Sequence, residues 1–460
     1  MRGLRIVVIG AGSTYTPELV SGFIRRQERL KIDSFAFCDT DEERCEILSA
    51  FTERMLRRAG LGVRVERYGD FREAVRDADY VITQIRVGKM PARILDERIP
   101  MQHGLIGQET TGLGGLSCAL RTVPAIDAIA RAVRELASPT AWLINFANPS
   151  GLVTEAVLES QPDARCIGLC NIPVKLAQEA CRLLGREVVC EFTGLNHLCW
   201  LTGIYDGQTE LLGRLLSMPI EQSGLNNIPN MRYTPQELRA VGGFPCGYLN
   251  YYYHRDEMLR KCQDEEQTRG EICLALERQL LAIYADPSSD TAPALLEKRG
   301  GAMYSTAAVS LIDALENDTG EAHVVNVQNR GVLPMLRPQD VAEMRCRITR
   351  DGAEPLPLRS RPTEHITGLV QAVKAYERLA ARAALRGSYP DALAAALSHP
   401  LSGDFARTKA ALDALLEAHR KNLSLSFFEE RLTIKSQARN ARKGEKNADG
   451  QKGHGKADVH

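Results

Sequence analysis

The sequence predicts an α/β protein, with a Rossmann-like, doubly wound parallel sheet in the N-terminal part and an α+β domain after it. Two observations predict this fold. Short strand-like runs alternate with helical stretches over roughly the first 190 residues, and the first run, at residues 4–10, is continuously apolar rather than alternating. Continuous apolar strands are typical of parallel sheets that helices cover on both faces. The alternation of strand and helix implies right-handed crossovers between parallel neighbours.

The expected elements follow one another along the first half of the chain. They are a strand at 4–10, a helix at about 17–29, a strand at 34–39, a helical stretch to Gly60, a short strand at 63–68, a strand at 80–84, a helix at about 122–136, a strand at 142–146, a helix after Ser150 and a strand at 165–169. No apolar run reaches the roughly 18 residues that a membrane-spanning helix needs. We therefore expect no membrane span.

The pattern divides the chain into three parts. Residues 1–193 are predicted to form the nucleotide-binding domain, and residues 194–430 a second domain in which strands near 191–195 and 324–327 are mixed with long helical stretches. The segment 431–460 becomes rich in Ala, Gly, Asn and Lys from about Lys435, with almost nothing apolar to offset the entropy of ordering. We expect a disordered tail, although a basic tail could also contact nucleic acid.

Composition and charge argue against several classes of protein. The chain has 460 residues, 44% of them hydrophobic, and its 58 Lys and Arg balance 58 Asp and Glu. A balanced charge creates no field that would attract nucleic acid or an anionic membrane, so a small-molecule ligand is expected. The 12 cysteines are scattered, and the N-terminus reads as a strand rather than a basic and apolar leader, which indicates a reduced, cytoplasmic protein.

A glycine-rich turn directly follows the first expected strand. Such a turn brings backbone N–H groups and the positive end of a helix up to a pyrophosphate. The third glycine of the usual pattern is replaced by Tyr15, but Asp39 ends the second strand, where a carboxylate can bind ribose hydroxyls and repel a 2′-phosphate. A tight turn and a surface aspartate are the alternative. We expect NAD rather than NADP, held by Gly10, Gly12, Ser13, Thr14 and Asp39.

Polar side chains follow three later strands, at the sheet edge where ligands of open α/β sheets bind. They are Arg86 after 80–84, Asn148-Pro149-Ser150 after 142–146, and Cys170-Asn171 after 165–169. If His197 lies near Cys170, a thiolate and a neutral imidazole would provide two ligands for a transition metal and leave positions open for substrate. Taken singly, a cysteine at a strand end and a histidine in a loop are more often packing residues.

The segment Gly88–Gly115 is dense in charged and polar residues, among them Arg93 and Glu109. We expect a loop that lies over a ligand. A solvated loop with internal salt bridges is the alternative.

A cluster of tyrosines occupies Tyr248–Tyr253. A buried aromatic stripe is the ordinary explanation. A tyrosine near a metal or a cationic ring could instead act as a base, because its pKa of about 10 would be lowered there.

Six sequence blocks together resemble glycoside hydrolase family 4, the NAD- and divalent-metal-dependent glycosidases typified by 6-phospho-β-glucosidases. The resemblance covers about residues 5–420. The blocks are 9–19 (IGAGSTYTPEL), 96–100 (DERIP) through 106–110 (IGQET), Asn148-Pro-Ser150, Cys170-Asn-Ile-Pro173, Gly194-Leu-Asn-His197 and Tyr248-Leu-Asn-Tyr-Tyr252. The order and spacing of these blocks are far more specific than the glycine turn alone.

The resemblance implies a fold similar to lactate and malate dehydrogenases and a hydrolysis that does not use two carboxylates. NAD takes a hydride from C3 of the sugar, which makes the C2 proton removable, and elimination then expels the C1 substituent. Water adds back and the hydride returns to C3, so NAD is regenerated in each cycle. A metal, usually Mn²⁺, stabilises the charge that develops on the C2 and C3 oxygens.

The resemblance also implies roles for individual residues. Cys170 and His197 bind the metal, Tyr248 takes the C2 proton, and Tyr251 or Tyr252 is the alternative base. Arg93 holds the C6 anion, since a guanidinium suits phosphate geometry. Asn148 and Asn171 lie around the sugar hydroxyls, and Glu109 supports the metal site. Family members with Asn after the metal-binding Cys tend to be β-specific, so Asn171 favours 6-phospho-β-glucosides.

Some positions depart from the family pattern. Lys89, Asn329-Arg330-Gly331 and the segment 336–340 are more basic than usual. Extra cations beside the C6 pocket would fit another C6-anionic glycoside, such as a sulfonated sugar, and a 6-phospho-α-glucoside is a further alternative substrate. An NAD-dependent hydroxy-acid dehydrogenase and a catalytically silent NAD-binding regulator are the rival functions. The resemblance suggests a homodimer or homotetramer.

Overall fold

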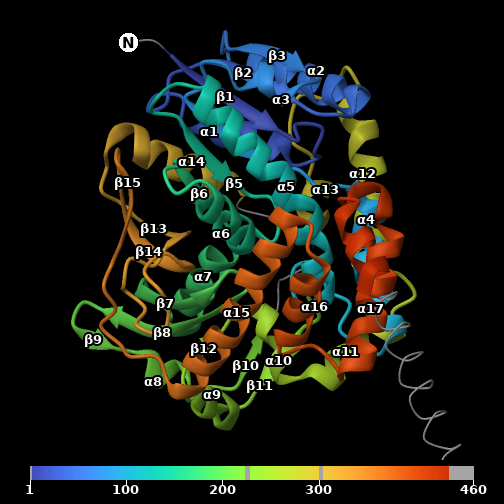
Figure 1. The fold of residues 1–460 in the computed structure, drawn as a ribbon. Helices are drawn as coiled ribbons and strands as arrows, with labels where there is room; N and C mark the ends of the chain where they lie inside the picture. Colours follow the sequence, from blue (N-terminus) through green and yellow to red (C-terminus); the bar gives the residue numbers. More distant parts are fainter. Residues whose placement is uncertain (1–2, 223–227, 300–303, 435–460) are drawn as a thin grey trace, which may run out of the picture.

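A computed structural model describes residues 3–222, 228–299 and 304–434 (Figure 1). Its centre is a nine-stranded sheet in the order β15-β14-β13-β6-β5-β4-β1-β2-β3. The first six strands in the chain are β1 (Leu4–Ile9), β2 (Ile32–Cys38), β3 (Arg64–Tyr68), β4 (Tyr80–Thr83), β5 (Trp142–Asn145) and β6 (Cys166–Gly168). All their pairings are parallel. The order 3-2-1-4-5-6 is that of a Rossmann sheet, as predicted.

Three strands from the C-terminal half extend this sheet. They are β13 (Ala322–Gln328), β14 (Val341–Thr349) and β15 (Gly352–Pro355). β13 pairs antiparallel with β6 through Asn326 and Gly168, and β14 and β15 follow antiparallel. The sheet is therefore mixed, and it does not end near residue 190 as the strand pattern indicated.

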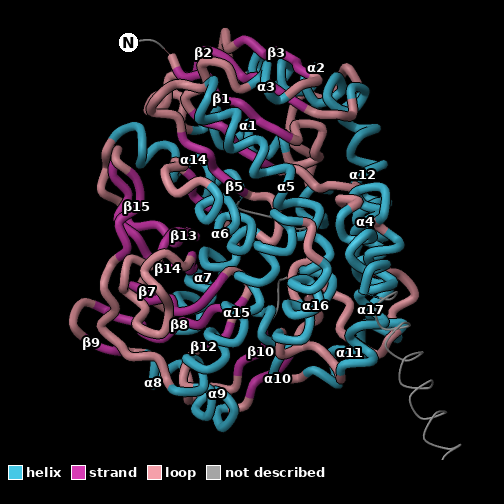
Figure 2. The backbone as a smooth tube through the Cα atoms, viewed as in Figure 1, coloured by secondary structure: helices cyan, strands magenta, loops and turns pink. Residues whose placement is uncertain are grey.

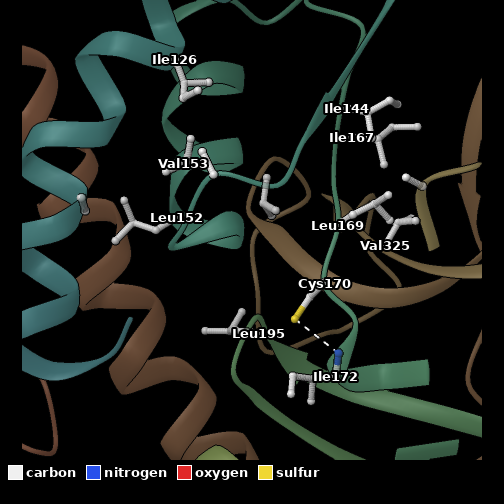
Figure 3. Packing of buried hydrophobic residues seen from close by; sticks show 14 of the residues in the cluster. Ile126, Ile144, Leu152, Val153, Ile167, Leu169, Cys170, Ile172, Leu195 and Val325 are labelled. Atoms are coloured by element: carbon white, nitrogen blue, oxygen red, sulfur yellow. Dashed lines mark hydrogen bonds between the residues drawn. The ribbon is translucent and has the colours of Figure 1, made fainter. Parts of the chain in front are cut away.

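Helices connect and cover the parallel strands (Figure 2). They are α1 (Thr16–Arg25), α2 (Glu42–Arg58), α3 (Phe71–Ala74), α4 (Lys89–Gln102), α5 (Gly112–Leu136), α6 (Ser150–Ser160) and α7 (Ile172–Leu184). Aliphatic side chains of neighbouring strands, such as Ile144, Ile167 and Val325, belong to one buried cluster, which also includes Cys170 (Figure 3).

The expected loop at Gly88–Gly115 is largely helical. α4 fills residues 89–102, and α5 begins at Gly112, ten residues before the expected start. Three charged side chains of α4, those of Arg93, Asp96 and Glu97, are buried and paired. Asp96, which is fully buried, binds Arg121 at 2.6 Å. The polar sequence here reflects buried ion pairs within helices, so the prediction of a loop is wrong, whereas the placement of the segment over a ligand stays a prediction.

α5 is the one described helix whose length and apolar composition would allow it to cross a membrane, and 83% of its most apolar window is buried inside the fold. Its long apolar surface is thus explained by packing, because α6 and α15 (Glu364–Arg386) lie against it.

The second half of the chain adds a small sheet and a group of helices. The strands are β7 (Val189–Leu195), β8 (Leu198–Asp206), β9 (Thr209–Glu210) and β12 (Phe244–Pro245), with β10 (Ile220–Gln222) paired to β11 (Met231–Tyr233). The helices are α8 (Leu212–Leu215), α9 (Pro235–Val241), η1 (Gly247–Leu249), α10 (Asn250–Tyr253), α11 (Arg255–Asp264), α12 (Arg269–Ala285), α13 (Leu295–Arg299), α14 (Tyr304–Asn317), α15, α16 (Tyr389–Ser398), α17 (Phe405–Ala418) and η2 (Arg420–Asn422). α12 and α17 both pack on α4 (Figure 1).

The predicted tail lies mostly outside the described residues. Residues 426–434 are helical, so the first four residues of the segment 431–460 continue a helix. The segment 435–460 is not described.

Candidate active site

A cavity of about 630 Å³ opens at the carboxyl ends of the parallel strands. The glycine turn after β1 and the end of β2 line one part of it, and the residues after β5 and β6 line another. The predicted site residues on its wall are Gly10, Gly12, Ser13, Asp39, Arg93, Glu109, Asn148, Cys170, Asn171, His197 and Tyr248. Segments far apart in the sequence therefore meet at one site, as expected for this edge of an open sheet.

The turn after β1 is shaped to admit a close backbone approach. Gly10 has φ of 91°, and a Cβ there would lie 2.9 Å from the Gln84 carbonyl carbon. A Cβ on Gly12 would lie 2.8 Å from Asp39 Oδ2, which accepts a hydrogen bond from the Gly12 N–H at 2.8 Å. The turn leads into α1, whose N-terminus faces the same cavity wall. This turn leaves room for a close approach by a dinucleotide, and the Asp39 carboxylate lies beside it on the cavity wall.

Two residues next to the turn differ in their placement. The Thr14 side chain is fully buried and does not line the cavity. Tyr15, which replaces the third glycine, does line it, and the guanidinium of Arg299 lies over its ring at 4.4 Å from the ring centroid. Tyr15 therefore contributes to the wall where the glycine pattern would leave space.

Cys170 and His197 lie side by side in the cavity. Cys170 ends the loop after β6, and His197, with φ of 64°, sits in the turn between β7 and β8. The Cys170 Sγ is 3.4 Å from His197 Nε2, and the Ile172 N–H at the start of α7 points at the same sulfur at 3.5 Å (Figure 3). The sequence hypothesis that these two side chains are neighbours is thus correct.

The chemistry of this pair suits a divalent transition metal. Burial lowers the pKa of His197 to about 3, so the imidazole is neutral and can donate a lone pair. Burial raises the pKa of the Cys170 thiol, and a bound cation would reverse this by stabilising the thiolate. Among the described residues no third thiol, imidazole or carboxylate completes a metal cluster. Two protein ligands would leave coordination positions for substrate oxygens.

Tyr248 stacks on the histidine of this pair. Its ring lies parallel to that of His197, with the centroids 3.9 Å apart and an interplanar angle of 13°. Burial raises the pKa of its phenol. The other tyrosines named as candidate bases lie elsewhere: Tyr252 OH is bound to Thr111 Oγ1 at 2.9 Å, and Tyr251 lines a separate cavity of about 400 Å³. Of this cluster only Tyr248 lines the cavity that contains Cys170.

Glu109 and two arginines form a network of ion pairs on the cavity wall that also contains Cys170 and His197. Arg93 Nη1 is 2.9 Å from Glu109 Oε1, its Nε is 2.8 Å from Glu97 Oε1, and Arg86 also pairs with Glu109. Burial alone would raise the pKa of Glu109, but Arg86 and Arg93 lower it below its ordinary value. Arg93 is therefore held in place on the wall of the cavity, and the two carboxylates balance its positive charge.

The positions that depart from the family pattern are not gathered around the sugar site. Lys89 pairs with Asp41 at 2.6 Å, next to Asp39 on the dinucleotide side of the cavity. No residue of 329–340 lines the cavity. The expected extra cations beside a C6 pocket are therefore not found among the described residues, and the argument for a sulfonated sugar loses its basis.

Sequence reasoning missed residues that reach this site from the C-terminal half. Arg299 at the end of α13 lines the cavity and pairs with Glu277 of α12, which also binds Arg44 at 3.3 Å. The signal was weak, since Arg299 is marked only by the two glycines that follow it. Thr110, which binds His197 Nδ1 at 2.9 Å, belongs to the block 106–110 of the family resemblance, and nothing else in the sequence distinguishes it.

Comparisons with known proteins agree on one family. The model for family 4 glycosyl hydrolases matches residues 5–186, and the model for the family's C-terminal domain matches residues 192–402. A 6-phospho-beta-glucosidase of Escherichia coli (strain K12) is 38% identical over 86% of this chain and 91% of its own length. A phospho-alpha-glucosidase of Clostridium acetobutylicum is 29% identical over 91% of this chain and 98% of its own length.

A solved structure extends the similarity to three dimensions. The 6-phospho-beta glucosidase from Thermotoga maritima, determined with manganese, NAD+ and glucose-6-phosphate, has a TM-score of 0.83 and 35% identity. The match covers 92% of this chain and 99% of that one. Both halves of the chain are included in the match.

Proposed function

Because the chain belongs to family 4 of the glycosyl hydrolases, we propose that it hydrolyses 6-phospho-β-glucosides with NAD and a divalent metal, Mn²⁺ or a similar ion, as cofactors. One observation carries the proposal: Cys170, His197 and Tyr248 meet in the same cavity as the Gly10–Gly12 turn. A hydroxy-acid dehydrogenase has no use for a thiol beside an imidazole. The site therefore supports a glycosidase that uses NAD as a cofactor.

The residues present fit both cofactors. Gly10 and Gly12 leave the space that a Cβ would fill, and Asp39 favours free ribose hydroxyls over a 2′-phosphate. Cys170 and His197 supply the sulfur and nitrogen donors that Mn²⁺ or a related ion can accept. When bound, NAD supplies a hydride acceptor and the metal a Lewis acid.

We assign the removal of the C2 proton to the phenolic oxygen of Tyr248. Stacking on His197 fixes the phenol ring next to the residue that, with Cys170, would hold the metal. Tyr251 and Tyr252 do not share this cavity wall. A proton acceptor needs to be within hydrogen-bond reach of the proton it removes, and of these three tyrosines Tyr248 is the one that lines the cavity with Cys170 and His197.

The anionic group at C6 is assigned to Arg93. Its guanidinium lies on the cavity wall between Glu97 and Glu109, so its orientation is set before substrate arrives. Asn148 and Asn171 line the same cavity and can bind sugar hydroxyls. Asn171 cannot protonate a leaving oxygen. The preference for the β-anomer is supported by sequence identity, which is 38% to a 6-phospho-beta-glucosidase and 29% to a phospho-alpha-glucosidase.

We also propose that the enzyme works in the cytoplasm as a homodimer or homotetramer. The cysteines are all free, which suits a reducing compartment. The oligomeric state rests on the family resemblance, and light scattering on the purified protein would measure it.

The test is hydrolysis of p-nitrophenyl 6-phospho-β-glucoside by purified protein, with NAD⁺ and Mn²⁺ varied independently. We expect p-nitrophenol release that requires both and proceeds without accumulation of NADH. The α-anomer and the 6-sulfo analogue serve as matched substrates, and both should react at least about tenfold more slowly, a difference of about 1.4 kcal/mol. Release that ignores NAD⁺, or steady production of NADH, would refute the proposal.

A further inference from the structure

Thr110 contacts the far side of the proposed metal ligand His197. Its hydroxyl oxygen is 2.9 Å from His197 Nδ1, while the other ring nitrogen, Nε2, faces Cys170. Thr110 is buried, with 6% of its surface exposed, so water does not compete for these contacts. The ring nitrogen that carries the proton depends on whether the Thr110 hydroxyl donates a hydrogen bond to Nδ1 or accepts one from it.

Gln108 decides the direction of the Thr110 hydroxyl. The Thr110 backbone N–H donates to Gln108 Oε1 at 2.6 Å, and because an N–H can only donate, the amide atom there is the oxygen. The Thr110 hydroxyl lies 2.8 Å from the same oxygen, which cannot donate in return. The single hydroxyl proton of Thr110 therefore points toward Gln108.

A hydroxyl whose proton is already committed can only accept from His197. Nδ1 must then carry the proton, and Nε2 is left with the lone pair that faces Cys170 and the cavity. If Thr110 instead donated to Nδ1, its oxygen would face Gln108 Oε1 at 2.8 Å with no proton between them. The hydrogen-bond directions along Gln108, Thr110 and His197 are mutually consistent in one arrangement only.

The segment that carries Thr110 is held against the start of α5. A Cβ on Gly114 would lie 2.2 Å from the Gln108 carbonyl oxygen, and one on Gly115 would lie 2.6 Å from the Thr110 carbonyl carbon. The helix can begin this close to the segment only because both positions are glycine. Thr110 is thus supported by backbone contacts as well as by Gln108.

We propose that Thr110 is a positioning residue that fixes His197 in the Nδ1–H tautomer, so that Nε2 is ready to bind the divalent metal. The inference rests on the proposed metal site. Partners behind a metal-binding histidine set its tautomer and ring orientation, and losing one typically weakens metal binding about 10- to 100-fold.

The test is Mn²⁺ affinity, measured by electron paramagnetic resonance of free Mn²⁺, in Thr110→Val, Thr110→Ser and Thr111→Val. Valine keeps the shape of threonine without the hydroxyl, and serine restores the hydroxyl. Thr111 is the matched control because it is equally buried, at 5% exposed, but binds Tyr252 and His399 instead of His197. We expect Thr110→Val to weaken binding about 10- to 100-fold, and Thr110→Ser and Thr111→Val to stay within about threefold, the usual spread for a context-dependent contact.

Two results would overturn the inference: Thr110→Val that binds Mn²⁺ as tightly as the unmodified chain, or Thr110→Ser that binds as weakly as Thr110→Val. Should the valine variant not fold, ¹⁵N NMR of histidine in the unmodified, metal-free chain decides. The His197 signal, identified by its loss in His197→Gln, should show a protonated Nδ1, and a protonated Nε2 would refute the inference.

Two further variants separate this inference from the proposed metal site. If Cys170→Ser and His197→Gln leave Mn²⁺ binding unchanged, the metal site itself is wrong. If both abolish binding while Thr110→Val does not, the metal site stands and only the role of Thr110 is wrong.

Discussion

At the scale of single residues, the site depends on which of several similar side chains reaches the cavity. Three tyrosines within five positions are chemically equivalent in the sequence, yet their surroundings differ. Tyr248 stacks on His197, Tyr251 lines a separate cavity, and Tyr252 is tied to Thr111 and His399. Position in the fold, rather than residue type, selects Tyr248 as the proposed base.

We predict that Tyr248→Phe lowers kcat about 10²- to 10⁴-fold, the usual contribution of a general base. The ring and its stacking on His197 remain and only the hydrogen bond between the phenol and Thr110 is lost, so Mn²⁺ and NAD⁺ affinities should change far less than kcat. Tyr252→Phe is the control, because it removes the same hydroxyl from a position outside the cavity that contains Cys170. A Tyr248→Phe variant with near-normal kcat would move the base to another residue.

At the scale of elements, α4 shows how buried charge holds the site. Arg93 is only 3% exposed and pairs with Glu97 one turn away and with Glu109 beyond the helix. Arg98 on the same helix is half-exposed and pairs with Glu271 at 2.6 Å. The two ion pairs have similar distances but different surroundings, and burial decides what each contributes to stability.

Replacing Arg93 with Ala should lower the free energy of unfolding by about 3–5 kcal/mol, because the buried Glu97 loses its guanidinium partner and the buried Glu109 keeps only Arg86. Arg98→Ala, the matched control, should cost about 0–1 kcal/mol, as exposed pairs do. Urea denaturation measures both. Equal losses for the two variants would mean that the Arg93 network does not stabilise this part of the fold.

The turn between β1 and α1 is the second element that the site requires. Gly12→Ala should weaken NAD⁺ binding about tenfold or more, equivalent to about 1.4 kcal/mol, because the added Cβ would meet Asp39 Oδ2 at 2.8 Å. Gly62→Ala is the control, since nothing lies within 4 Å of a Cβ there. Isothermal titration calorimetry of both variants checks this. Unchanged NAD⁺ affinity in Gly12→Ala would contradict the placement of the dinucleotide.

At the scale of the whole molecule, a buried carboxyl joins the turn between β7 and β8 to the antiparallel strands of the main sheet. Glu343 of β14 accepts hydrogen bonds from Asn196 Nδ2 at 3.1 Å and from Asn326 Nδ2 at 3.2 Å. Burial raises the pKa of Glu343 to about 7, although contacts with Asn196, Cys199 and Asn326 oppose this and Glu377 adds to it. The folded protein therefore binds this proton more tightly than the unfolded chain does.

This gives a pH dependence of stability with a definite sign. The contribution of a group whose pKa is raised on folding is fully present below its unfolded pKa, near 4.5, and is lost as the pH rises through about 7. Between pH 5 and 8 the unmodified, metal-free protein should lose up to about 3 kcal/mol from this group. Glu343→Gln should remove most of that slope, and the exposed Glu266→Gln should not. The same slope in both variants would show that Glu343 is ionised in the folded protein.

The sequence predicted the parts of the molecule that have a local signature. The alternation of strand-like runs with helical stretches predicted the six parallel strands, and the glycine turn with Asp39 predicted a dinucleotide site that stays a prediction. The strand at 324–327 was recognised, but nothing local indicates that β13 pairs with β6, because pairing partners are set by the whole fold. α4 was missed since its buried charges are satisfied by distant partners, such as Arg121 for Asp96.

The chemical end of the site needed more than local patterns. Cys170 and His197 are separated by other elements, so their contact became an expectation only through the family resemblance. Arg299 was missed because it reaches the cavity from the C-terminal half, with no motif around it. Sites assembled from distant segments depend on tertiary structure that residue spacing does not encode.

The central claim is that hydrolysis breaks the C2–H bond of the sugar. The most direct measurement is hydrolysis of a 6-phospho-β-glucoside in D₂O with NAD⁺ and Mn²⁺, followed by NMR of the glucose 6-phosphate formed in early turnovers. Free glucose 6-phosphate incubated with the enzyme controls for later exchange. We predict deuterium at C2 of the product. Product that retains only hydrogen at C2 would contradict the account, because direct displacement at C1 leaves that bond intact.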